Sequence, residues 1–570
     1  MVHYMQKAAN LLAAALPEFT PGQIFALLER PKTEEHGDIA FPCFQVAKLR
    51  RLAPPALAQS LAAELKAEGD FESIKATGPY LNFRLSPKAA FRIVGEVNSR
   101  GAEYGRSNTG QGQKVLIEYS SPNVAKELHI GHFRNTILGQ SLNNIFRATG
   151  HETISLNHLG DWGQQFGKVA YGYLKWGNEE EMLRNPLEYL MKLYVRFNQE
   201  LETNPDLDRE ARLLFKKIEE KDPTLTRLWE QFCELSIEGL KKVYGRLGVS
   251  FDHYIGESFY VDKIEALLVD LRAKNLLELS DGAQVVKMGE EEPPCLILTS
   301  DGTSLYATRD IAAAIWRHSH FGFDRCLYVV GNEQQLHLKQ VFAVLAKLGH
   351  EWSPTLQHVN YGLYRFKDGK FSTRKGKVVL AEEVMNEARE KALAVIQAKN
   401  PNLANMEEVA ETVGVGAVIF NDLSTDRLKD VEFDWERILD FEGDTGPYVQ
   451  YSYARACSIL RQGEKKGLIP VVPEHSATLA ASEAALSLMK QFGRFEPALE
   501  GALRLGKPSI MANYAIDLAK SFNSFYRQVK VLDDAAPEQE TREKLGLVKS
   551  FRQVLGNTLS LLCMKAPEEM

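Results

Sequence analysis

The sequence predicts an α/β protein in three parts: a small α/β unit, a central domain around a parallel sheet, and an all-helical region. Three observations predict this fold class. Between residues 113 and 385, strand-like segments alternate with helical ones, as is typical of parallel sheets. Residues 1–112 mix helical and strand-like patterns, and residues 386–570 are dominated by helical patterns. A chain of 570 residues is also too long for one hydrophobic core.

The composition is that of an ordinary folded protein. Hydrophobic residues make up 44% and charged residues 25% of the chain. No apolar run is long enough to cross a bilayer, so we expect no membrane partner. Six scattered cysteines without a C-x-x-C pair indicate neither a zinc site nor disulfides, and they fit a reducing cytoplasm. The net charge of −7 still permits local patches that bind phosphate.

The N-terminal unit contains a clear helix and a clear strand. Leucines recur at helical spacing within residues 54–69, and a strand predicted at residues 80–85 ends at Ser86-Pro87. Residues 8–16 are mostly apolar, and we interpret them as an amphipathic helix rather than as a signal peptide.

The central domain begins with a strand at residues 114–119, a Ser-Ser-Pro-Asn turn, and a helix that starts near Leu128. This order is typical of nucleotide-binding sheets. A second strand at residues 153–157 leads to Gly160-Asp-Trp-Gly163, and a helical insertion is predicted at about 175–280. Strand-like segments return afterwards, at 283–287, 295–299, 326–330 and 357–363.

His129, Gly131 and His132 follow the first strand and stand at the start of the predicted helix. Histidines three residues apart share one helical face, and Gly131 leaves room for a nucleotide base against the backbone. The helix N-terminus adds partial positive charge, so this segment can hold a triphosphate and stabilise charge on phosphorus. The alternative is a pair of surface histidines beside a turn.

A basic segment at residues 365–377 contains six basic residues and one acidic residue. Its glycines and hydroxyl groups suit a strap over phosphates. A solvated charged loop is the alternative. The candidate side chains are Lys370, Ser372, Arg374 and Lys375.

Together, these two segments resemble the signature pair of class I aminoacyl-tRNA synthetases, His-Ile-Gly-His and Lys-Met-Ser-Lys-Ser. The resemblance implies a Rossmann-type catalytic domain at residues 113–385. The second segment departs from the family pattern, because Phe371 stands in place of methionine and Thr373-Arg374 in place of the last lysine and serine. The cation that meets pyrophosphate therefore stays open among Lys370, Arg374 and Lys375.

Residues 118–123, 157–163, 306–310 and 331–337 resemble segments of arginyl-tRNA synthetases. A guanidinium calls for carboxylates and a hydroxyl in a fixed fork, which Glu118, Asp310 and Tyr306 supply. The resemblance implies that arginine is bound by Glu118, Ser120, Asn123, His132, Tyr306, Asp310 and Gln334. It implies that ATP is bound by Pro122, Asn123, His129, Gly131, His132, Gly160, Asp161 and Gly163.

Two of these residues could have a structural role instead of binding arginine. Asp310 could cap a helix or pair with Arg309 or Arg317, and Glu118 could be the buried partner of a neighbouring strand.

The outer regions resemble tRNA-contacting domains of the same family. Residues 1–112 resemble the additional domain that contacts the outer corner of tRNA, and residues 386–570 resemble the helical anticodon-binding domain. Aromatic side chains and arginine can stack on unpaired bases, although aromatics at helical spacing are more often core. The predicted tRNA contacts are Trp162, Tyr448, Tyr451, Arg455, Phe525 and Tyr526.

The resemblance implies that ATP, with Mg²⁺, activates L-arginine and that arginine then passes to the 3′-terminal adenosine of tRNA(Arg). We expect a cytoplasmic monomer without a protein-held metal site, which activates arginine only once tRNA is bound. One alternative is a nucleotidyltransferase of the same fold, which would leave residues 400–570 without a purpose. Another is a tRNA-binding regulator, in which the phosphate-binding residues would be eroded.

Overall fold

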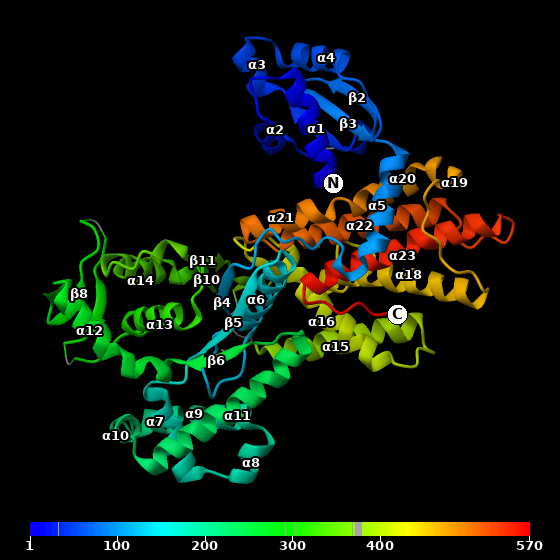
Figure 1. Cartoon of the computed structure of the whole chain (residues 1–570). Helices are drawn as coiled ribbons and strands as arrows, with labels where there is room; N and C mark the ends of the chain where they lie inside the picture. The colour runs from blue at the N-terminus through cyan, green and yellow to red at the C-terminus, as the bar shows by residue number, and fades with distance from the viewer. Residues whose placement is uncertain (32, 291, 301, 367–368, 371–378) are drawn as a thin grey trace.

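The computed structural model describes the chain apart from residues 32, 291, 301, 367–368 and 371–378. Its central sheet has five parallel strands in the order β11-β10-β4-β5-β6 (Figure 1). The strands are β4 (Lys114–Glu118), β5 (Glu152–Leu159), β6 (His253–Gly256), β10 (Arg325–Gly331) and β11 (Leu356–Tyr361). The predicted parallel sheet is confirmed.

Strand β4 lies in the middle of this sheet and is buried on both faces. Val115 and Ile117 pack into the larger core, to which α6 (Ile130–Ala148) belongs, while Leu116 packs into a second core with α13 (Tyr306–Phe321). Such a strand reads as an uninterrupted apolar run, which made it predictable. Since β5 and β10 flank β4 on opposite sides, the connections diverge there, and the crevice beyond its carboxyl end is the expected ligand site.

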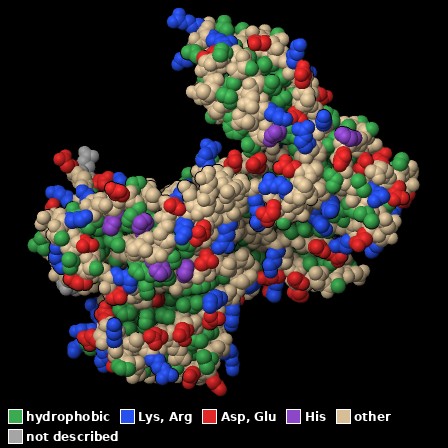
Figure 2. Space-filling view, in the orientation of Figure 1, with side chains coloured by type: hydrophobic (Ala, Val, Ile, Leu, Met, Phe, Trp, Pro, Cys, Tyr) green, Lys and Arg blue, Asp and Glu red, His purple; other side chains and the backbone are tan. Residues whose placement is uncertain are grey.

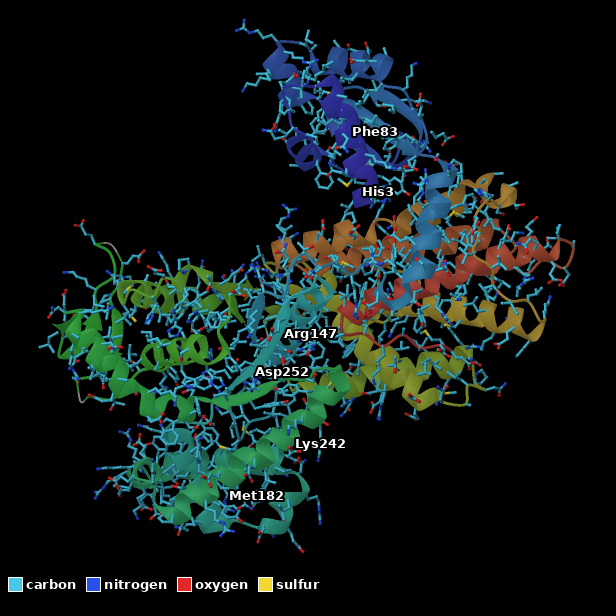
Figure 3. All side chains as sticks on the ribbon, viewed as in Figure 1. His3, Phe83, Arg147, Met182, Lys242 and Asp252 are labelled. Carbon is cyan, nitrogen blue, oxygen red and sulfur yellow. The ribbon has the colours of Figure 1, made fainter. Side chains whose placement is uncertain are left out.

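Helices separate β5 from β6, but the predicted insertion at about 175–280 matches them only in part. Strand β6 lies inside that range and is the outer strand of the central sheet. Asp252, just before β6, accepts hydrogen bonds from the backbone N–H (2.8 Å) and Oγ (2.7 Å) of Ser155. Arg147 at the end of α6 forms an ion pair with Asp252 at 3.4 Å (Figure 3). The helices are α7 (Gln164–Trp176), α8 (Glu179–Arg184), α9 (Pro186–Thr203), α10 (Asp206–Glu219) and α11 (Pro223–Leu247).

A lobe follows β6 and covers one face of the central sheet. The segments predicted as strands at 283–287 and 295–299 belong to a separate antiparallel sheet in the order β7-β8-β9, so they do not extend the central sheet. The elements of the lobe are a 3₁₀ helix η3 (Glu257–Lys263), α12 (Ile264–Ala273), β7 (Leu277–Ser280), β8 (Ala283–Val286), β9 (Cys295–Leu298), α13, a 3₁₀ helix η4 (Asn332–Gln334) and α14 (Gln335–Lys347).

The N-terminal domain is an antiparallel sheet in the order β1-β3-β2 with helices against it, as predicted. It projects away from the central sheet and rests on the C-terminal helices (Figures 1 and 2). Ion pairs of 2.9 Å join Asp38 to Lys490 and Arg30 to Asp517 across this contact. The elements are α1 (Val2–Ala15), α2 (Pro21–Leu27), β1 (Ile39–Pro42), α3 (Phe44–Arg50), α4 (Pro54–Glu64), β2 (Phe71–Thr77), β3 (Tyr80–Leu85) and α5 (Pro87–Arg100).

The C-terminal region is helical except for one short strand, β14 (Val431–Phe433), which pairs in parallel with β12 (Tyr364–Phe366). Strand β13 (Gly369–Lys370) pairs with β12 on its other side. Among the described residues, no helix is both long enough and apolar enough to span a bilayer. The helices are α15 (Ala381–Lys399), α16 (Met406–Ser424), α17 (Trp435–Ile438), α18 (Gly446–Lys465), α19 (Ala477–Ala480), α20 (Glu483–Phe492), α21 (Phe495–Leu505), α22 (Ser509–Gln528) and α23 (Glu538–Leu561).

Candidate active site

His129 and His132 form a reciprocal cap at the start of α6. The Nδ1 atom of His129 accepts the backbone N–H of Gly131 at 3.1 Å, and Nδ1 of His132 accepts the backbone N–H of His129 at 3.3 Å. The two rings lie against each other with their centroids 3.8 Å apart and their planes tilted by 31°. A Cβ atom at Gly131 would lie 2.9 Å from Cε1 of His129, so glycine is required for this close approach.

Both imidazoles are held in their neutral form. Burial, followed by the charge of Lys126, lowers the pKa of His129, and burial with the charges of His129 and Lys126 lowers the pKa of His132 to about 3. Because Nδ1 of each ring accepts a backbone N–H, the neutral ring carries its proton on Nε2. The pair can therefore donate hydrogen bonds to phosphate oxygens without acting as a base.

The chain that follows the basic segment lies beside these histidines. The N–H of Ile130 donates to the carbonyl of Val379 at 3.1 Å, and the N–H of Ala381 donates to the carbonyl of Leu128 at 2.8 Å. Residues 379–381 therefore lie next to the start of α6. Of the predicted side chains, Ser372, Arg374 and Lys375 lie outside the described residues, and Lys370 is described only as part of the backbone of β13.

Pro122 and Asn123 lie against Gly160 where β4 and β5 end. The N–H of Gly160 donates to the carbonyl of Pro122, and the N–H of Val124 donates to the carbonyl of Gly160, both at 3.0 Å. A Cβ atom at Gly160 would lie 2.2 Å from Oδ1 of Asn123, so glycine is needed there too. Gly163 precedes α7 with a φ of 128°. The predicted ATP-binding glycines thus line the same edge of the sheet as His129.

Glu118 is engaged inside the protein. Its Oε2 atom accepts a hydrogen bond from Nη1 of Arg317, and both side chains are buried. Nε of Arg317 donates to the hydroxyl of Tyr260 at 3.1 Å. In this structure the buried partner of Glu118 therefore comes from helix α13 and not from a neighbouring strand.

Asp310 lies on α13 two turns before Arg317, on the same helical face. Its Oδ2 atom is 2.6 Å from Nε2 of His337. Burial opposes ionisation of Asp310, but the hydrogen bond from His337 and the charges of His158, His337 and Arg317 hold its pKa below the usual range. The neighbouring Arg309 is paired instead with Glu257 at 3.0 Å.

The remaining residues predicted to bind arginine differ in accessibility. Tyr306 is 67% exposed at the first turn of α13, Gln334 is exposed in η4, and Asn123 is exposed in the turn after β4. Ser120, by contrast, is buried, and its hydroxyl lies 2.7 Å from the Tyr244 hydroxyl. The hydroxyl of Ser120 therefore shapes the turn after β4 from within the core.

Asp161 and Trp162 also face inward. The carboxylate of Asp161 accepts the backbone N–H (2.8 Å) and the hydroxyl (2.6 Å) of Ser258, and burial raises its pKa. The ring of Trp162 packs edge-on against Trp229 and Phe215, at centroid distances of 5.5 and 5.2 Å. Both residues connect the sheet to neighbouring elements, and Trp162 is an aromatic anchor for the helical insertion.

On the C-terminal helices, Tyr451 and Tyr526 are 38% and 42% exposed. The guanidinium of Arg455 lies over both rings, 4.7 and 5.2 Å from their centroids. These three side chains border a groove of about 940 Å³. Phe525, which was also predicted to contact tRNA, has no exposed surface in this structure. The hydroxyl of Tyr448 accepts a hydrogen bond from Asn523 at 3.0 Å.

Three residues of this site were not singled out from the sequence, namely Lys126, Glu257 and His337, and Arg317 was named only as an alternative partner of Asp310. Lys126 lies three residues before His129, close enough to lower its pKa. His337 is the last residue of the segment 331–337, and the resemblance of that segment to the family could have indicated it. Glu257 and Arg317 carry no local motif, because their partners are distant in the sequence.

Comparisons with protein families match all three parts of the chain. Residues 94–435 match "tRNA synthetases class I (R), catalytic domain". Residues 449–570 match "DALR anticodon binding domain", and residues 6–85 match "Arginyl tRNA synthetase N terminal domain". The catalytic match extends beyond residue 385, where the sequence predicted the domain boundary.

Curated relatives and solved structures are similar over the whole chain. The arginine–tRNA ligase of Alkaliphilus metalliredigens is 42% identical and that of Exiguobacterium sibiricum 46% identical, each over 100% of both chains. The solved structure of Thermus thermophilus arginyl-tRNA synthetase has a TM-score of 0.81 at 28% identity and covers 99% of each chain. The chain therefore belongs to the arginyl-tRNA synthetase family of the class I tRNA synthetases.

Proposed function

We propose that the carboxyl edge of the central sheet activates L-arginine with ATP and transfers it to the 3′-terminal adenosine of tRNA(Arg). In the first step, the arginine carboxylate attacks the α-phosphorus of ATP and pyrophosphate leaves. In the second, the terminal ribose hydroxyl attacks the carbonyl carbon of the adenylate and AMP leaves. Positioning and charge stabilisation supply most of the rate. Family membership supports both steps.

ATP is proposed to bind across the start of α6. The Nε2–H groups of His129 and His132 donate to phosphate oxygens as charge grows on the α-phosphorus, and Lys126 adds a cation. Gly131 and Gly160 leave backbone surface open to the nucleotide. The cation that meets pyrophosphate is proposed to be one of Lys370, Arg374 and Lys375, beside Ser372.

Asp310 is the residue that we propose takes the guanidino charge of arginine. The observation that carries this proposal is the pairing of charges: Glu118 is bound by Arg317, and Glu257 by Arg309. The carboxylate of Asp310 is held ionised by a neighbouring imidazole instead. A carboxylate that forms no ion pair with an arginine or lysine among the described residues can pair with the guanidinium of the substrate. Tyr306, Asn123 and Gln334 are proposed to position the rest of the amino acid.

Magnesium is proposed to arrive with ATP. Within the described part of the chain, no three histidine, cysteine or acidic side chains gather closely enough to hold a metal ion. Mg²⁺ keeps several waters and often binds through substrate phosphates, so this protein needs no all-protein cage for it.

Arg455, Tyr451 and Tyr526 are proposed to receive unpaired bases of the tRNA, with Tyr448 beside them. We further propose a monomer, which sedimentation analysis would test. A cytoplasmic location is supported by six unpaired cysteines.

Charging of total tRNA with each amino acid offered separately tests the function. We expect charging with arginine alone, and comparable charging with any second amino acid would contradict the proposal. Exchange of pyrophosphate into ATP should require tRNA, so robust exchange with arginine alone would count against that requirement.

Replacement of His129 or His132 by alanine should slow adenylate formation by more than roughly tenfold and leave tRNA affinity unchanged. The matched control is His253→Ala, which removes an exposed imidazole from the first residue of β6. Equal rates in all three variants would exclude the proposed role of the histidine pair.

A further inference from the structure

Residues 426–430, called the junction here, connect the helical region to the central sheet. The carboxylate of Asp426 pairs with Lys507 at 2.7 Å, in the turn between α21 and α22. The side chain of Arg427 donates to the carbonyl of Gly506 (2.9 Å) and to Oδ1 of Asn360 (2.9 Å), at the end of β11. The junction therefore holds a turn of the C-terminal helices against a strand of the catalytic sheet.

The same junction is paired with the residues that lead into β12. The N–H of Gly362 donates to the carbonyl of Arg427 at 2.9 Å, and the N–H of Leu363 donates to Oδ1 of Asp430 at 2.8 Å. Parallel pairing of β12 with β14 continues this contact. Two segments more than sixty residues apart are thus held side by side.

Arg134 of α6 binds both segments at once. Its Nη1 donates to the carbonyl of Gly362 at 2.6 Å, and its Nη2 donates to the carbonyls of Arg427 (3.2 Å) and Lys429 (3.0 Å). The side chain is 1% exposed, and the carboxylate of Asp422 lies 3.5 Å from its Nε. A planar guanidinium can reach carbonyls on two segments through separate nitrogens, which a lysine ammonium cannot reproduce.

Arg134 follows His132 by two residues on the same helix. Because its guanidinium is bonded to the junction, it also fixes the position of the two histidines relative to the junction. The coupling would therefore run from Lys507 through Asp426 and Arg427 to Arg134 and α6. Each link is a hydrogen bond, an ion pair or one residue of backbone.

We propose that Arg134 is a positioning residue that ties the catalytic end of α6 to the placement of the C-terminal helices through the junction. This inference rests on the proposed roles of His129 and His132. Arg134 touches no substrate in this proposal, and it acts by fixing the two imidazoles. Binding of tRNA to the C-terminal helices would thereby bear on the geometry of arginine activation.

The test compares Arg134→Lys with the wild-type chain, using rates of arginylation and separate measurement of tRNA affinity. We expect kcat to fall roughly twentyfold or more, while the KM for ATP and the Kd for tRNA stay within about threefold. Retention of more than half of kcat would overturn the proposal. A loss of tRNA affinity as large as the loss of kcat would also overturn it, because the effect would then lie in binding.

A second variant, Lys507→Met, breaks the ion pair with Asp426 at the far end of the junction and leaves Arg134 in place. Combined with Arg134→Lys in a double-mutant cycle, it should show non-additivity in kcat of about two- to threefold, since both act on one network. The matched control is Lys466→Met, whose partner Asp534 lies outside the junction, and its effect should simply add. Additivity in both cycles would overturn the coupling.

Lys507→Met alone should lower kcat by about threefold with unchanged tRNA affinity. This expectation applies even if Arg134→Lys fails to fold. An unchanged kcat for Lys507→Met would contradict the proposal. Failure of the wild-type chain to arginylate tRNA would instead contradict the proposed function, so the two failures are distinguishable.

Discussion

Asp310 and His337 come from two different helices and meet with Nε2 of His337 only 2.6 Å from Oδ2 of Asp310. The imidazole therefore supports the ionised carboxylate and lowers its pKa against the opposing effect of burial. The bond uses one carboxylate oxygen, and among the described residues Oδ1 of Asp310 has no hydrogen-bond partner. An ionised acid with one oxygen available is suited to a guanidinium ligand.

Replacement of Asp310 by asparagine should therefore raise the KM for arginine by roughly 100-fold, because the substrate charge would be buried without its counter-ion. Steady-state arginylation measures this change. The control Asp262→Asn removes an exposed carboxylate on η3 that pairs with the neighbouring Lys263. A KM within about threefold of the wild-type value for Asp310→Asn would show that another acid recognises arginine.

The buried pair of Glu118 and Arg317 makes a prediction about stability. Arg317→Met leaves the carboxylate of Glu118 buried without its cation, which should cost about 3–5 kcal/mol of unfolding free energy. The double variant Glu118→Gln/Arg317→Met removes both charges and should recover at least half of that loss. Urea unfolding curves measure both values. If the double variant is no more stable than Arg317→Met, charge burial is not the cause.

His132 should make the folded protein sensitive to mild acid. Its pKa is lowered from 6.5 to about 3, so between these values the unfolded chain takes up a proton that the folded chain does not. Its contribution to stability is complete well above pH 6.5 and decreases as the pH falls, by about 1.4 kcal/mol at pH 5.5. Going from pH 7.5 to 5.5, the variant His132→Gln should lose about 1.4 kcal/mol less than the wild-type chain. Identical pH dependence of the two unfolding midpoints would refute this.

The strand β4 and the start of α6 could be predicted because their signals are local. A strand buried on both faces is a run of apolar residues, and His129, Gly131 and His132 stand close together in the sequence. β6 was missed because it has only four residues, of which His253 is exposed and lies on an edge strand. Such a segment has neither a long apolar run nor a clear alternation.

The pairing of charges could not be predicted, since it depends on tertiary contacts. Glu118 and Arg317 are 199 residues apart, and no local pattern distinguishes Arg317 from the nearby Arg309 as the partner of Glu118. The two neighbours Phe525 and Tyr526 illustrate the same limit. Adjacent residues point about 100° apart on a helix, so the sequence showed that aromatics were present but not which of them faced the core.

Because the two side chains point in different directions, they differ in their access to tRNA. Tyr526 is 42% exposed beneath the guanidinium of Arg455, whereas Phe525 has no exposed surface. Stacking of a base on an aromatic ring contributes about 1–3 kcal/mol, so Tyr526→Ala should weaken tRNA binding by roughly 5- to 150-fold at fixed salt. Phe525→Leu, the matched control, should lower the unfolding midpoint but leave the Kd for tRNA within about twofold. Equal losses of tRNA affinity in the two variants would mean that this surface acts through helix packing, because only an exposed ring can stack on a base.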